Sequence, residues 1–192
     1  MLRRSLVACA ALSAALLSAP VLAQTVGQSA PALALKDSAG KLVNLADFRG
    51  KTVVLEWVNP SCPFVKKHYG AGHMQATQKA AAGDGVVWLS VSSTHPGHAD
   101  YKQPAELASW MQQQGSGASA LLMDDDGKVG KAWGARTTPH LYVVNPAGTL
   151  VYAGAIDSKP SANPADIPAA TNYVRQALGE LKAGQAVSKP SS

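Results

Sequence analysis

The fold of this chain is decided by residues 52–67, TVVLEWVNPSCPFVKK, which pass from an apolar run into a proline-marked helix start. Residues 52–58 are mainly β-branched and aromatic and are apolar on both faces, which is typical of a central strand in a buried sheet. Pro63 suits the first position of a helix, because its missing N–H would have no partner there. We therefore expect a buried strand, a short turn that carries Cys62, and then a helix.

The remaining apolar segments complete an α/β pattern. Two short strands around a turn at 37–40 form an N-terminal β-hairpin, and apolar strands then alternate with amphipathic helices. Gly70 and Gly72 predict a kink within the first helix. Because crossover helices join apolar strands and a late hairpin follows, we expect an α/β three-layer sandwich with a central mixed β-sheet flanked by helices. The expected strands are 32–35, 42–45, 52–58, 86–92, 120–123, 141–145 and 149–153, and the expected helices are 63–82, 104–114, 127–133 and 164–181.

The first 23 residues have the pattern of a cleavable signal peptide. Arg3 and Arg4 give a positive start, residues 6–17 are almost wholly apolar, and small residues precede a cleavage point after Ala23. The apolar run is too short for a retained membrane anchor. A lipoprotein signal ending at Cys9 is the other alternative, but it leaves hardly any apolar segment before the cysteine. We expect a periplasmic or otherwise exported protein that has no membrane contact after cleavage.

Charge and cysteine count narrow the function further. The chain has 17 Lys and Arg against 12 Asp and Glu, and two of the arginines lie in the leader. No run of basic residues is long enough to suggest a nucleic-acid surface. Of the two cysteines, Cys9 leaves with the leader, so the mature protein keeps only Cys62 and cannot form an internal disulfide.

Cys62 is the candidate catalytic residue. Its place between a strand and Pro63 puts it at or near the N-terminus of a helix, where backbone N–H groups favour a thiolate over a thiol. Lys66 and Lys67 in the next turn add positive charge. We therefore expect a nucleophilic thiolate at neutral pH, and the alternative is a buried structural cysteine.

The chain resembles thioredoxin-like proteins of the redoxin superfamily, which includes the alkyl hydroperoxide reductases and thiol-specific antioxidants. Thr138-Pro139 is similar to the cis-proline loop that faces the active cysteine in that fold, and residues 59–69, NPSCPFVKKHY, resemble one exported, peroxiredoxin-like branch. The likeness covers about residues 25–182, which implies one redoxin domain over 24–182 followed by a flexible tail at 183–192. The N-terminal segment of domains in this superfamily is resembled by a series of positions in this chain: Gly27, Ala30-Pro31, Leu35, Asp37, Gly40-Lys41, Val43, Leu45, residues 48–51 and residues 53–55.

The resemblance assigns roles around the cysteine. Cys62 falls on the first, nucleophilic cysteine of the thioredoxin C-x-x-C motif, and Val65 stands where the resolving cysteine would be. Turnover must therefore use an external thiol or a partner's cysteine. Peroxiredoxins carry Thr or Ser at the position of Asn59 and Pro at that of Leu55; the Asn59 amide could still donate a hydrogen bond to a peroxide. Arg136 could be the cation that stabilises the departing oxygen.

Two further positions support this site. Glu56 lies where thioredoxins carry a buried acid beneath the nucleophile, and burial would raise its pKa toward values useful for accepting a proton from the thiol. The alternative is that Glu56 faces solvent or pairs with a lysine. A cis bond between Thr138 and Pro139 would let the Thr138 backbone pair with an extended substrate, and the alternative is an ordinary trans turn.

We expect no metal and no cofactor. Three consecutive acids at 124–126 lack the alternate spacing of a calcium loop and predict a turn and helix cap instead. His68, His73, His95 and His98 could form a copper site with the cysteine, but copper-delivery relatives of the fold use two cysteines. The face of the sheet taken by His140 stays open.

The sequence thus predicts an exported thiol oxidoreductase or one-cysteine peroxidase. Thiolate Cys62 would attack a peroxide or a disulfide, and an external thiol would reduce the resulting sulfenic acid or mixed disulfide. The alternative is a redox-silent binding module that holds an extended peptide or a client protein in the groove beside Pro139.

Overall fold

The computed structural model describes residues 24–192, so the predicted signal peptide lies outside the described residues. Strands and helices alternate much as the sequence predicts. No helix within the described part is long and apolar enough to cross a membrane. The elements are β1 (Ala34–Asp37), β2 (Leu42–Asn44), the 3₁₀ helix η1 (Leu45–Phe48), β3 (Val53–Trp57), α1 (Pro63–Gly70), α2 (His73–Gly83), β4 (Val87–Ser92), α3 (Pro104–Gln113), β5 (Ala120–Met123), α4 (Lys128–Ala132), β6 (His140–Val144), β7 (Leu150–Gly154), the 3₁₀ helix η2 (Pro164–Ala169) and α5 (Tyr173–Lys182).

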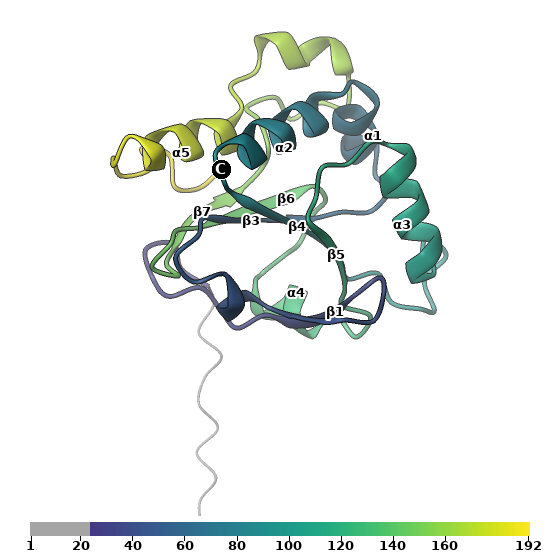
Figure 1. Ribbon diagram of the computed structural model, residues 1–192. Coiled ribbons are helices and arrows are strands. Elements are labelled where there is room, and N and C mark those ends of the chain that lie inside the picture. Colours follow the sequence, from purple (N-terminus) through teal and green to yellow (C-terminus); the bar gives the residue numbers. More distant parts are fainter. Residues whose placement is uncertain (1–23) are drawn as a thin grey trace, which may run out of the picture.

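The strands form one mixed sheet with helices on both faces, which confirms the predicted α/β layered architecture. Seven strands lie in the order β2-β1-β5-β4-β3-β6-β7. The β3–β4 and β4–β5 pairs are parallel, whereas β6 runs antiparallel to β3 and the hairpin partners are antiparallel. In Figure 1, α1, α2 and α5 lie above the central strands and α4 lies below them.

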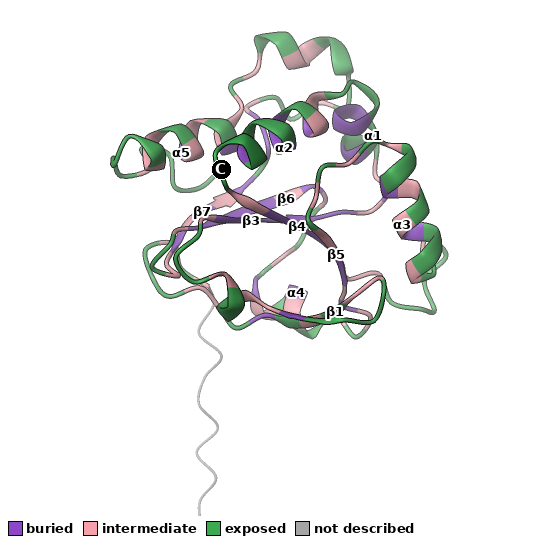
Figure 2. Ribbon diagram, viewed as in Figure 1, coloured by how far each residue is buried: buried purple, intermediate pink, exposed green. Residues whose placement is uncertain are grey.

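Strand β3 is buried along its whole length, because helices cover both of its faces. Val54 packs into a core beneath α1, α2, α3 and α5, whereas Val53, Leu55 and Trp57 pack into a second core on the α4 side. Figure 2 shows that the central strands are buried, whereas much of the outer helices is exposed. The period-two alternation of a strand therefore decides which face each side chain of β3 reaches.

Two predicted helices are each interrupted. The helix expected over 63–82 ends at Gly70 and begins again at His73, because Gly72 takes the left-handed conformation with φ +70°. The predicted kink is thus a complete break. The helix expected over 164–181 divides into η2 and α5, and α5 starts where Asn172 accepts the Arg175 N–H at 2.9 Å.

The predicted flexible tail at 183–192 instead packs against the domain. The Pro190 carbonyl accepts the backbone N–H of Ala153 at 3.0 Å, and the Ser192 hydroxyl accepts that of Ala155 at 2.9 Å. Ala153 belongs to β7, the edge strand, whose outer N–H groups have no neighbouring strand. The N-terminal segment 27–30 covers the other end of the same edge, where Leu150 exchanges backbone hydrogen bonds with it. Composition alone misses this pairing, because the tail is polar and its partner is an edge of the sheet.

Candidate functional site

Cys62 lies at the junction of β3 and α1, as the sequence predicts. It is the N-cap residue of α1, with extended backbone angles, and Pro63 follows as the first helical residue. Its side chain is half-buried and free of any disulfide. The thiol makes no hydrogen bond to the N–H groups of its own helix; Sγ instead donates to the Thr138 carbonyl oxygen at 2.8 Å.

The Thr138–Pro139 loop meets Cys62 because of sheet topology. Strand β6 starts at His140 and pairs antiparallel with β3, so that His140 lies opposite Trp57 near the end of β3. The loop before β6 and the turn after β3 therefore reach the same end of the sheet. The Thr138–Pro139 peptide bond is cis, as predicted, and Pro139 is buried.

Asn59 and Arg136 lie together, but in a different cavity from the thiol. The side-chain oxygen of Asn59 accepts the Ser61 N–H at 2.8 Å, which fixes the turn before the cysteine. Asn59 and Arg136 line a cavity of about 220 Å³ that Cys62 does not line; Thr138 is shared with the cavity beside the cysteine. Asn59 and Arg136 thus border one cavity and Cys62 borders another, and Thr137 and Thr138 line both.

Glu56 is completely buried in β3, which excludes the alternative of a solvent-facing side chain. Burial raises its pKa to about 7, and hydrogen bonds to the carboxylate partly oppose this rise. The second oxygen, Oε1, is buried without a partner. No hydrogen bond among residues 24–192 joins Glu56 to Cys62. Oε2 accepts hydrogen bonds from Trp88 Nε1 at 2.8 Å, Tyr69 Oη at 3.1 Å, Gln78 Nε2 at 3.2 Å and Ser90 Oγ at 3.3 Å.

A groove of about 790 Å³ opens beside the thiol. Its walls come from the first turns of α1, the cis-proline loop, the segment after β7, the start of α5 and the tail. This volume falls within the usual range of small-molecule sites. The lining residues include Cys62, Phe64, His68, Thr138, Pro139, Ile156, Asp157, Lys159, Tyr173 and Lys189.

Sequence reasoning missed a buried ionic cluster in the wall of this groove. Lys67 was expected to add positive charge near the sulfur, but it is buried and its Nζ lies 3.5 Å from Asp157 Oδ2. The same ammonium donates to the Lys159 carbonyl oxygen at 3.4 Å. His68 Nε2 lies 3.8 Å from the Asp157 carboxylate. The cluster therefore ties α1, which follows the cysteine, to the segment after β7.

His68 and His73 extend the cluster as a hydrogen-bonded chain. Asn172 Nδ2 lies 3.1 Å from His73 Nε2, and the two Nδ1 atoms lie 2.8 Å apart. If Asn172 donates, His73 Nδ1–H donates to His68, whose Nε2–H then faces Asp157. Burial lowers the pKa of His68 to about 4 and also lowers that of His73, so both rings are neutral near pH 7.

The same three side chains, His68, His73 and Asp157, lie close enough to be considered as metal ligands. The Lys67 ammonium opposes this use, because a metal cation there would lie beside a buried positive charge that already pairs with Asp157. The arrangement fits a charge-paired and hydrogen-bonded network better than a metal site.

Other candidate residues have structural roles. Asp124 accepts the N–H groups of Val129 and Gly130 at 3.1 and 2.8 Å, which confirms the predicted turn and cap at the start of α4. His140 faces the α4 side, where its Nδ1 lies 3.0 Å from the Tyr142 hydroxyl, and burial lowers its pKa to about 4. It does not line the groove beside the cysteine.

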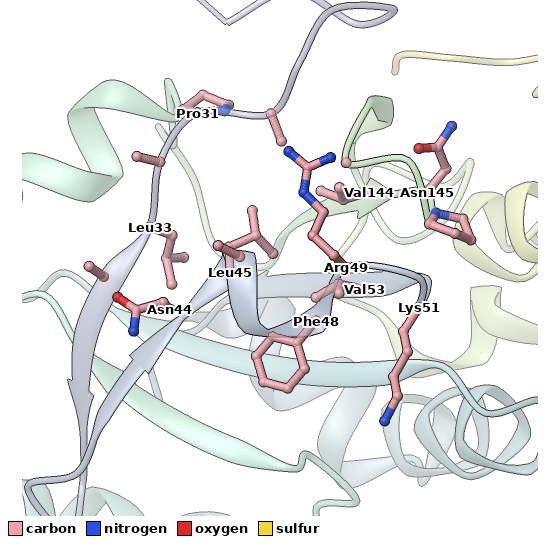
Figure 3. Close-up of a pocket in the computed structure, with 16 residues that line it drawn as sticks. Pro31, Leu33, Asn44, Leu45, Phe48, Arg49, Lys51, Val53, Val144 and Asn145 are labelled. Atoms are coloured by element: carbon pink, nitrogen blue, oxygen red, sulfur yellow. The ribbon is translucent and has the colours of Figure 1, made fainter.

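A third cavity, of about 370 Å³, lies at the opposite end of β3 (Figure 3). Val53, the first residue of β3, and Val144, the last of β6, line it, whereas Cys62 follows the other end of β3. Arg49 extends between these walls and donates to the Ala147 carbonyl oxygen. This cavity is therefore separate from the thiol site.

Comparisons with known proteins agree with this geometry. The protein named "Putative peroxiredoxin Rv2521" of Mycobacterium tuberculosis is 32% identical over 119 residues, which cover 62% of this chain and 69% of that protein. A crystal structure of an uncharacterized conserved protein from Geobacillus kaustophilus is 25% identical, covers 87% of this chain and 88% of its own, and has a TM-score of 0.72. The thioredoxin domain of thiol-disulfide oxidoreductase BVU-2223 from Bacteroides vulgatus is 24% identical, with coverages of 68% and 89% and a TM-score of 0.53. The AhpC/TSA family model matches residues 26–153, more than half of the sequence, and the chain therefore belongs to the AhpC/TSA family, with a thioredoxin-like fold.

Proposed function

We propose that the protein is an exported, thiol-dependent oxidoreductase or one-cysteine peroxidase that works through Cys62. The observation that carries this proposal is the position of the sulfur. Sγ lies at a helix start, against the cis-proline loop, and borders a groove that a substrate can enter. We would expect a purely structural cysteine to be packed in the core rather than to border such a groove.

The chemistry balances with one protein sulfur and an external thiol. With a disulfide, the Cys62 thiolate forms a mixed disulfide and releases one substrate thiolate; an external thiolate then attacks the mixed disulfide and frees Cys62. With a peroxide, the thiolate takes one oxygen to become a sulfenic acid, and an alcohol or water leaves. A thiol condenses with the sulfenic acid to give a mixed disulfide and water, and a second thiol completes the reduction.

The cis-proline loop supports the binding of an extended substrate. The Thr138 carbonyl accepts the thiol, and the Thr138 N–H takes part in no hydrogen bond within residues 24–192. That N–H is free to pair with a substrate backbone, as in strand addition. Glu56 is proposed as the proton acceptor for the attacking or leaving thiol; its pKa of about 7 suits that role, and the connection to the sulfur would run through intervening groups.

Export forms part of the proposal. The leader at 1–23 and the NPSCPFV motif at 59–65 support a periplasmic or otherwise exported location. There the protein would meet disulfides and peroxides, and a thiol from outside the chain would replace the resolving cysteine that Val65 cannot supply.

The direct test traps the sulfenic acid. Mature protein is treated with one equivalent of hydrogen peroxide in the presence of dimedone, and peptide mass spectrometry locates the label. We expect labelled Cys62 and, in a parallel reaction with a disulfide, a mixed disulfide on the same residue. Cys62→Ser provides the unlabelled control, and a native protein whose thiol resists both reagents would overturn the proposal.

The second candidate function is a redox-silent binding module. The hydrogen bond from Sγ to the Thr138 carbonyl favours it, because a thiol held as a donor is less available as a nucleophile. In this case the groove would hold an extended peptide or client without reacting. An inert Cys62 together with peptide binding that Cys62→Ser leaves unchanged is the result expected for this module.

A further inference from the structure

Two lysines in the groove beside Cys62 have no acidic partner. Lys159 and Lys189 both line the cavity, and neither forms an ion pair within residues 24–192. The Lys189 ammonium lies 4.9 Å from the centre of the Tyr173 ring, a cation–π contact that keeps it at the groove. The one acidic side chain in the lining, Asp157, is already paired with the buried Lys67. The groove therefore has two lysine side chains in its lining with which no acidic side chain pairs.

The positive charge of the groove bears on which external thiol reduces Cys62, because the predicted mature sequence has no second cysteine. The proposed function requires an external thiol, and that thiol must reach the half-buried sulfur, which borders this groove. A cavity of about 790 Å³ accommodates a molecule of small-peptide size. An ammonium group in the wall of the groove attracts a carboxylate, and it adds little to the binding of a neutral or cationic ligand.

We propose that the groove binds a small thiol that carries carboxylate groups, and that Lys159 and Lys189 select it as the reductant of Cys62. The inference rests on the proposed function and names the class of its second substrate. The bound thiol, RSH, attacks the sulfenic acid to form Cys62–S–S–R and water. A second RSH then attacks that bond, releases R–S–S–R and returns Cys62 to its reduced form.

The test separates binding from chemistry. The probe is S-methylglutathione, which keeps both carboxylates of glutathione but cannot react, and the protein is the Cys62→Ser variant. We expect calorimetry to detect binding that weakens about two- to thirtyfold in a Lys159→Gln/Lys189→Gln double substitution, the range that follows when two exposed ion pairs are lost. Lys79→Gln, an exposed lysine of α2 outside the groove, should leave binding unchanged. The dimethyl ester of S-methylglutathione should bind the protein that keeps both lysines as weakly as S-methylglutathione itself binds the double lysine variant.

A kinetic arm uses the reactive protein. Oxidised Cys62 should be reduced faster by glutathione than by its dimethyl ester, and the double lysine variant should remove most of this difference. No binding of S-methylglutathione, or binding that ignores both lysines, would overturn the inference while dimedone labelling of Cys62 still supports the proposed function. Failure of that labelling would overturn the proposed function itself, so the two failures can be told apart.

Discussion

At the scale of single residues, the reactivity of Cys62 depends on its place at a helix start and on one hydrogen bond. The start of α1 favours the thiolate, whereas the Thr138 carbonyl, 2.8 Å from Sγ, accepts a proton-bearing thiol. We predict that the helix start prevails, so that iodoacetamide alkylates Cys62 at pH 7 several-fold faster than free cysteine. Alkylation rates across pH 5–9 in native protein check this, with urea-unfolded protein as the control. A native rate at or below the unfolded one would contradict it.

Glu56 makes stability depend on pH. Burial raises its pKa from 4.5 to about 7, so the folded protein holds this proton more tightly than the unfolded chain. The resulting stabilisation is complete below pH 4.5 and is lost as the pH rises through 7. Glu56→Gln removes this titration, and the difference in unfolding free energy between variant and wild type should shift in favour of the variant by about 3 kcal/mol across that range.

Urea unfolding at several pH values measures this difference, and a difference that stays constant with pH would show that Glu56 does not titrate in that window. The same variant tests the proposed proton transfer. We expect the pH profile of Cys62 reactivity to move in Glu56→Gln, and an unchanged profile would remove Glu56 from the mechanism while leaving its effect on stability intact.

At the scale of elements, the break between α1 and α2 depends on one glycine. Gly72 has φ +70° and open space around its Cα, so an added methyl group meets no neighbour and only the backbone resists it. Gly72→Ala should therefore destabilise the fold by about 1 kcal/mol. Gly179, inside α5 with no such φ and equally open surroundings, supplies the matched control.

Gly179→Ala should stabilise by about 0.5–1 kcal/mol, because alanine is the better residue in a helix interior. Thermal or urea unfolding of the two variants gives the comparison. Two changes of the same sign would show that the left-handed turn between α1 and α2 is not required.

At the scale of the whole molecule, the Lys67–Asp157 pair joins parts of the chain that are 90 residues apart. Their side chains are 0% and 3% exposed, so neither charge can turn to water if its partner is lost. Lys67→Met and Asp157→Leu should each destabilise by about 3–5 kcal/mol, because each leaves the other charge buried and unpaired. A Lys67→Met/Asp157→Leu double variant should lose much less, because no unpaired charge stays buried.

Unfolding free energies of the single and double variants form a double-mutant cycle that measures the coupling. Additive losses would contradict the pairing, whereas a double variant close to the wild type would confirm it.

Features that depend on residues close together in the sequence could be predicted, whereas features that depend on contacts between distant residues could not. Local patterns fix β3 and β5, since apolar and β-branched runs bounded by turn residues have few alternatives. Proline and cysteine placement likewise predicts the start of α1. The pairing of Lys67 with Asp157 and the cavity shared by Asn59 and Arg136 depend on tertiary contacts that no local pattern encodes. Pro168 is a local signal for the break between η2 and α5 that the expected helix over 164–181 ignored, whereas the packing of the polar tail against β7 depends on distant residues.

Residues 27–30 and 190–192 lie along the outer side of β7, where their backbones take hydrogen bonds that a neighbouring strand would otherwise take. The border at the other side of the sheet is β2, which is only three residues long. A second copy of the molecule therefore finds little backbone onto which it could add its own sheet. We therefore expect the molecules not to polymerise by adding the sheet of one to the sheet of another, even at high protein concentration.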